Sequence, residues 1–178
     1  ATLDAVIGPL NVAAEYVDRI SKGDIPDRIT EEYRGDFNEI KNNLNRCIDA
    51  VNLMADDAKS LAAAAVEGKL ATRADATRHQ GDFRSIIEGV NNTLDAVIGP
   101  LNVAAEYVER ISKGDVPQQI TDEYKGDFNE IKNNLNQCID VVSGLLDETG
   151  KLIVAAKDGN LAARANAAQF RGDWKKLV

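Results

Sequence analysis

The chain has 178 residues, a formal net charge of −8, 44% apolar residues and only 5% aromatic residues. Its acidic balance argues against a nucleic-acid or anionic-lipid surface, since both favour clustered lysine and arginine, and no stretch approaches the ~18 consecutive apolar residues of a membrane span. The few aromatic residues favour thin helical packing over a thick globular core. No signal peptide or initiator methionine opens the chain, so we expect a piece of a larger, cytoplasmic protein.

The chain contains an internal repeat. Residues 2–51 return at 93–142 with 42 of 50 positions identical. A Gly-Asp-aromatic step recurs in phase with these copies, which gives a unit of about 45 residues in an alternating A-B-A-B series. We therefore expect four repeats, numbered one to four: 1–52 (A-type), 53–98 (B-type), 99–143 (A-type) and 144–178 (B-type, cut short).

The first helix is predicted over about residues 2–22, where apolar residues follow heptad spacing and form a seam that packs against partner helices. Pro9, and Pro100 in repeat three, follow a glycine near the beginning of this segment. We expect these prolines to mark a helix start or a tolerated kink; a flexible joint at alternate repeat boundaries is the other interpretation.

An extended connector follows, and it begins at a glycine because a left-handed residue that ends a helix is least costly there. Two spaced apolar residues, Ile25 and Ile29, are expected to act as plugs, meaning connector side chains that insert into a neighbouring groove. B-type connectors are one residue longer and carry alanine at the second plug position. The predicted turns and plugs are Gly23, Ile25, Ile29, Gly68, Leu70, Ala74, Gly114, Val116, Ile120, Gly159, Leu161 and Ala165.

The second helix is predicted to begin at Asp36 as N-cap, with Glu39 completing a capping-box-like pair. No breaker follows until Gly68, so this helix can run about 32 residues, roughly 48 Å, and join one repeat to the next. Equivalent starts are Asp82, Asp127 and Asp173. The seam leaves open whether Cys47 or Ile48 faces the core. In repeat two, Leu61 competes with the aligned alanines Ala55, Ala58, Ala62 and Ala65.

The predicted bundle core consists of the seam residues of both helix types. These are Leu10, Ala13, Val17, Ile20, Phe37, Ile40, Leu44, Val51, Phe83, Ile86, Val90, Leu94, Val97, Leu101, Ala104, Val108, Ile111, Phe128, Ile131 and Leu135.

A helix, a Gly-x-apolar-x-x-x-apolar connector and an Asp-started second helix together resemble the HAMP domain of bacterial sensory receptors and kinases. Gly23, Ile25 and Ile29 meet the connector pattern, and the Gly-Asp-Phe opening at Asp36 departs from the Asp-Glu pair common in that family. The alternation is similar to tandem poly-HAMP arrays. The resemblance implies an all-α fold of concatenated parallel four-helix (coiled-coil) bundles in a homodimer, with long helices shared between repeats.

The resemblance also implies a function. Such arrays relay signals between a covalently linked input domain and an output domain, either a chemoreceptor domain (methyl-accepting chemotaxis protein) or a histidine kinase of a two-component system. The parent protein would then be a cytoplasmic protein or an inner-membrane receptor with this part in the cytoplasm. Two alternatives are a passive coiled-coil spacer and a monomeric α-solenoid scaffold. The spacer does not explain the repeated connectors, and the solenoid predicts short antiparallel helices with tight turns.

No residue pattern predicts an enzyme. His79, the single histidine, is expected to be solvated or bonded to a backbone carbonyl, and the acidic runs at 31–32 and 56–57 lack metal-ligand spacing. Cys47 and Cys138 occupy one position in the two A-type repeats and are expected to be reduced and partly buried. We therefore expect no catalytic, cofactor-binding or metal site, no cofactor, no nucleic-acid partner and no small-molecule ligand.

Overall fold

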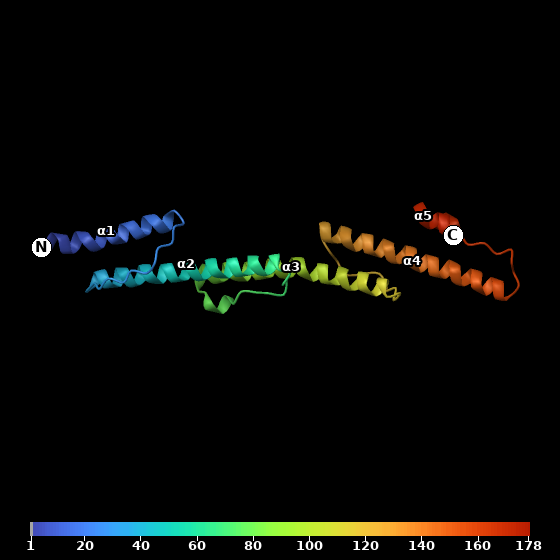
Figure 1. Ribbon diagram of the computed structural model, residues 1–178, viewed down its shortest axis with the longest axis horizontal. Helices are drawn as coiled ribbons and strands as arrows, with labels where there is room; N and C mark the ends of the chain where they lie inside the picture. The colour runs from blue at the N-terminus through green and yellow to red at the C-terminus, as the bar shows by residue number, and fades with distance from the viewer. Residues whose placement is uncertain (1) are drawn as a thin grey trace. The chain divides into compact units, whose positions relative to one another are not determined.

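The computed structural model describes residues 2–178, and within that range it is all-helical with no β-strand (Figure 1). The predicted all-α fold is confirmed. Ala1, the first residue predicted for repeat one, lies outside the described residues. The elements are α1 (Thr2–Ser21), α2 (Asp36–Val66), the short 3-10 helix η1 (Ala76–Arg78), α3 (Gly81–Ser112), α4 (Asp127–Lys157), the 3-10 helix η2 (Ala167–Gln169) and α5 (Gly172–Leu177).

The chain divides into two compact parts, Ala1–Asp95 and Ala96–Val178. Each part contains one A-type and one B-type connector. In the first part, α1 packs against α2 and the two run in the same direction, with the connector returning along them (Figure 1). The 31 residues of α2 and the 32 of α3 agree with the prediction of long helices that pass from one repeat into the next.

Every connector begins at the predicted glycine. Gly23 has a φ of 78°, and its amide donates to the Ile20 carbonyl while the Asp24 amide donates to the Arg19 carbonyl, both at 3.0 Å. These two bonds satisfy carbonyls that the end of a helix leaves unpaired. Gly68, Gly114 and Gly159 have φ angles of 74°, 80° and 77° and end their helices with the same pair of bonds. A side chain is disfavoured at this φ, which explains why glycine marks each helix end.

The predicted helix starts need correction. A glycine, Gly35, is the N-cap of α2 with a φ of 56°, and no side chain caps the helix. Asp36 is therefore the first helical residue, and its predicted capping box with Glu39 does not form. Asp127 likewise follows the N-cap Gly126, while α3 and α5 begin one residue before Asp82 and Asp173. The acid instead sits in the first turn, where it complements the helix dipole.

The two prolines that the sequence allows as helix starts lie inside helices. Pro9 falls in α1 and Pro100 in α3, and each helix continues on both sides of its proline. Neither residue is a helix start. A proline removes one backbone hydrogen bond and can bend a helix, but the neighbouring bonds carry the helix past it.

The buried residues of the single chain differ from the predicted seam. Within one chain Ile48 is 1% exposed and Cys47 is exposed, so Ile48 packs inside the chain and the expectation of a partly buried Cys47 is wrong there. Leu61 is buried, as its competition with the alanines allowed. The other buried apolar residues are Ile29, Ala64, Ile87, Ile98, Ile120, Ile139 and Phe170. No predicted core residue is fully buried, so one chain leaves its seam partly exposed.

Candidate functional site: the connectors and the helices that hold them

An asparagine side chain holds the second plug of the first connector. The Ile29 amide donates to Asn45 Oδ1 at 2.7 Å, and Asn45 Nδ2 donates to the Ile29 carbonyl at 3.0 Å. Asn45 is 5% exposed and Ile29 is 4% exposed, so both bonds are shielded from water. We call this two-bond contact the asparagine clasp. It fixes the backbone of the connector to the second helix of the same repeat.

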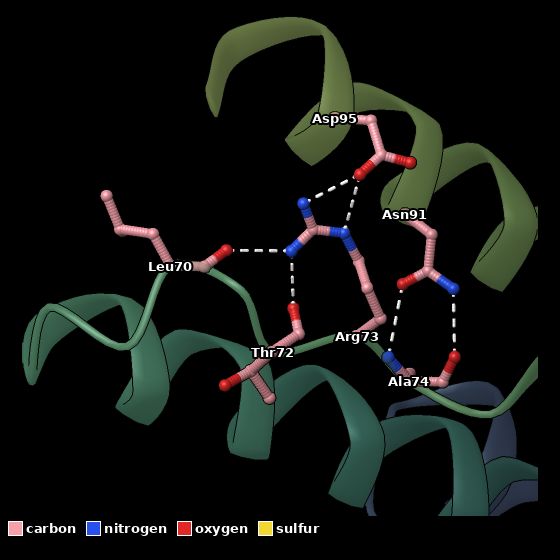
Figure 2. A network of polar contacts seen from close by, with 6 residues as sticks. All are labelled: Leu70, Thr72, Arg73, Ala74, Asn91 and Asp95. Carbon is pink, nitrogen blue, oxygen red and sulfur yellow. Dashed lines mark hydrogen bonds and ion pairs between the residues drawn. The ribbon is translucent and has the colours of Figure 1, made fainter. Parts of the chain in front are cut away.

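The clasp recurs in repeats two and three. Asn91 makes the same two bonds to Ala74, at 3.1 and 2.8 Å, and Asn136 makes them to Ile120, at 2.7 and 3.0 Å. Figure 2 shows the Asn91 clasp on the first half of α3. Because the clasp binds the backbone, it tolerates both isoleucine and alanine as the plug.

A second polar contact accompanies each clasp, one helical turn further on. In repeat two, Nε and Nη2 of Arg73 donate to Asp95 Oδ1 at 2.9 and 2.7 Å (Figure 2). The third nitrogen of Arg73 donates to the carbonyls of Leu70 and Thr72, so the side chain also braces its own connector. The equivalent pairs are Arg28 with Asp49 at 3.5 Å and Gln119 with Asp140 at 2.6 Å.

A-type connectors have a further tie to the helix that precedes them. Arg19 Nε donates to Asp24 Oδ2 at 2.7 Å, and Arg110 makes the same bond to Asp115. The guanidinium bond lowers the pKa of each aspartate from its ordinary value. Both pairs are solvent-exposed, so we assign them a minor share of the stability.

The predicted plugs are only partly buried. Ile29 and Ile120 are buried, and Ile25, Val116, Ala74 and Ala165 are half-buried. In contrast, Leu70 is 41% exposed and Leu161 is 79% exposed. These two leucines do not act as plugs within one chain. The more regular apolar anchors of the A-type connectors are Pro26 and Pro117, which are buried and were not predicted.

A ring side chain anchors the end of every connector, two residues before the glycine that precedes or opens the second helix. The rings are Tyr33, His79, Tyr124 and Phe170. Tyr33 lines a small hollow with Val12 of α1 and Phe37 of α2, and Tyr124 lines the equivalent hollow in repeat three. The prediction for His79 was wrong: the imidazole is 1% exposed and bonds a carboxylate of α2. The recurrence of a ring at this position is the signal that could have found it.

The HAMP domain family profile matches residues 1–53 and 78–144. The chain belongs to the HAMP domain family. HAMP domains are signal-relay modules that link the input and output domains of sensor proteins and act as linkers, not as catalysts. The matched ranges cover both A-type repeats and the second helix of repeat two. The asparagines of all three clasps lie within these ranges. No solved structure gives a significant match to the chain.

Three further observations on the described part of this HAMP chain concern metal sites, membrane spans and cavities. Within residues 2–178, no group of three or more His, Cys, Asp or Glu side chains could hold a metal ion. No helix in the same range combines the length and hydropathy that crossing a membrane needs. Hollows do occur beside the B-type connectors, one of about 290 Å³ that includes Phe83 and one of about 630 Å³ that includes Cys138 and Trp174. Their walls include the predicted seam residue Phe83 and the seam candidate Cys138.

Proposed function

We propose that this chain forms a parallel homodimer of concatenated four-helix bundles and relays a conformational change from an input domain to a chemoreceptor or histidine-kinase output domain in a bacterial sensory protein. The four repeats would have the predicted bounds 1–52, 53–98, 99–143 and 144–178. We further propose a cytoplasmic location, which is where such relays meet their output domains.

The observation that carries this proposal is the uncovered seam. On α3, five apolar residues are exposed in the single chain; the last four recur at steps of 7, 4 and 7, which is heptad spacing, and the first lies four residues before them. Their exposed fractions range from 39% at Val90 to 56% at Val108. A helix face of this kind is stable in water when another helix covers it, and heptad spacing matches a coiled-coil partner. The five are Ile86, Val90, Val97, Leu101 and Val108.

A second copy of the chain is the partner that fits this face. Leu10 and Val17 of α1 and Ile40 of α2 are exposed seam residues as well, so both helices of a repeat offer an apolar stripe. Two copies placed side by side in the same direction would join four such stripes into one bundle core. Residues such as Ile48 and Ile87 are already buried within one chain and do not need the second copy.

The relay itself would use the difference between repeat types. A-type repeats hold a large second plug, Ile29 or Ile120, whereas B-type repeats hold Ala74 or Ala165 at that position. Different plug volumes favour different helix packings, and an input can shift only an equilibrium whose states lie within a few kcal/mol. A change of packing in one repeat would pass to the next through the shared helix α2, α3 or α4.

The orientation of the copies can be tested with the native cysteines. Cys47 lies seven residues after Ile40 on the seam, and Cys138 has the same place in repeat three; both are exposed in the single chain. We would treat the single-cysteine variants C138S and C47S with a short bifunctional maleimide. A parallel homodimer predicts that each variant cross-links to itself. Cross-linking confined to the wild-type chain, through Cys47 to Cys138, would show antiparallel copies and contradict the proposal.

A further inference from the structure

One difference between the repeat types lies in the first helix, at the position eleven residues before the connector glycine. A-type repeats have valine there, Val12 and Val103, and B-type repeats have an acid, Asp57 and Glu148. The two valines line apolar hollows together with the anchoring tyrosines of their connectors. An acid at the same place cannot be buried without hydrogen-bond partners, so its surroundings must differ.

In repeat two the acid bonds the connector ring. Asp57 Oδ2 lies 2.7 Å from His79 Nε2, with 14% of the Asp57 side chain and 1% of the His79 side chain exposed. The His79 amide donates to the Ala76 carbonyl at 3.2 Å, which closes η1 immediately before α3. The contact thus joins α2 to the residues that lead directly into the next long helix.

Other charged groups surround this contact without replacing it. Arg78 Nη1 lies 3.8 Å from Asp57 Oδ1, and Arg78 is exposed. Asp75 is engaged by the amide and hydroxyl of Thr77, at 3.0 and 2.6 Å. His79 Nε2 is the short, buried partner of Asp57, so we take the Asp57–His79 pair as the contact that matters.

Repeat four places an acid–connector contact at the same position with different atoms. Glu148, whose side chain is 7% exposed, accepts from the Asn166 amide at 2.7 Å and from Lys151 Nζ at 2.6 Å. The connector ring is Phe170, and it lies against Gly144; a Cβ there would come within 3.4 Å of the ring. Repeat two has Leu53 at the position of Gly144 and the smaller His79 ring.

These contacts differ in kind from the apolar hollows that the valines and tyrosines line. A hydrogen bond is directional and weakens steeply when its angle or length changes, whereas apolar contact depends mainly on buried area. We propose that Asp57 and Glu148 are positioning residues, which fix one rotational setting of the first helix against the connector in B-type repeats. The contacts lie within one chain, so this proposal does not depend on the homodimer.

Amide hydrogen exchange on the full chain tests the proposal in repeat two, with D57A, H79A, the double variant and D57N. Removing the acceptor leaves a buried donor unpaired, so D57A should speed exchange at residues 75–80 by about 10- to 100-fold. D57N keeps an acceptor oxygen and should stay within about threefold of the wild type. The effect of the double variant should fall well short of the sum of the two single effects, because both substitutions remove the same contact. D56A is the matched control, since the Asp56 side chain is 74% exposed on the same helix.

The connector of repeat one, residues 24–34, serves as the internal reference. Faster exchange confined to repeat two in D57A, with rescue by D57N, supports the positioning role. Three results would overturn it: no change in D57A, additive effects in the double variant, or equal acceleration in both connectors, which would make Asp57 a general stability residue. If D57A does not fold, D57N alone decides. Exchange in repeat two at the wild-type rate then supports the proposal, and faster exchange there contradicts it.

Discussion

Replacing Asn45 by alanine removes the clasp on the first connector. The two lost bonds leave the Ile29 amide and carbonyl without their partners at a residue that is 4% exposed. An unsatisfied buried polar group costs about 1–3 kcal/mol. With some relief from water that enters the space of the lost amide, we expect N45A to lose about 2–4 kcal/mol of unfolding free energy through the clasp.

Helix propensity acts in the opposite direction and needs its own control. Alanine is favoured over asparagine in a helix by roughly 0.5–0.7 kcal/mol. Asn42 lies on the same helix and is exposed, so N42A measures that gain without touching the clasp. The quantity to compare is therefore the unfolding free energy of N45A against N42A. N136A should repeat the result, since Asn136 makes the same two bonds to Ile120.

Urea unfolding followed by circular dichroism gives these free energies. All variants must be measured at one protein concentration, because association contributes to the stability of a homodimer. N45A and N42A agreeing within about 0.5 kcal/mol would refute the reasoning, because it would show that solvent or a rearranged connector satisfies Ile29 at no cost.

Two further predictions concern a glycine and a carboxylate. G23A forces a side chain into a φ of 78° and should lower the unfolding free energy by about 1 kcal/mol. G89A lies inside α3 with open space around it and should raise the unfolding free energy by roughly 0.5–1 kcal/mol. Equal shifts of the melting temperature in the two variants would contradict this. The Lys151 ammonium and the Asn166 amide lower the pKa of Glu148, so its contribution to stability is complete above its unfolded pKa of about 4.3 and is lost as pH falls through the lower folded pKa. E148Q should therefore flatten the loss of thermal stability between about pH 5 and 3, and an unchanged acid profile would count against that role.

The long helices and the connector glycines could be predicted from the sequence because both signals are local. Heptad spacing and the absence of a breaker between Asp36 and Gly68 fix α2, and the φ of 78° at Gly23 explains why glycine ends α1. The helix starts could not be placed as well. Asp36 has the residue type of an N-cap, but Gly35 beside it adopts the positive φ that the chain needs there.

Polar residues with a tertiary role escaped prediction. Asn45 is polar and lies on a helix of mixed character, so pattern alone assigns it to the surface, yet it is 5% exposed. Asp57 appeared only as part of an acidic run without metal-ligand spacing, and His79 was expected to be solvated or bonded to a backbone carbonyl. Their partners are 16 and 22 residues away, and a local pattern contains no such pairing. A signal was present: Asn45, Asn91 and Asn136 recur in phase, each with an aspartate four residues later.

The predicted core illustrates a limit of another kind. The seam spacing identified which residues form one face, but Leu10, Val17 and Val108 remain about half exposed in a single chain. Periodicity identifies an apolar face without saying what covers it. The residues buried within the chain, such as Ile48 and Ile87, lie one position after seam positions in the sequence and are covered by the chain itself.

The central claim, that a second copy covers the seam, is tested most directly by the mass of the chain in solution, measured by light scattering over a dilution series. A parallel homodimer predicts a stable species of twice the 19.3 kDa chain mass that is highly helical by circular dichroism. A cooperatively folded monomer at micromolar concentration would contradict the account, because it would show that the apolar seam is stable without a partner.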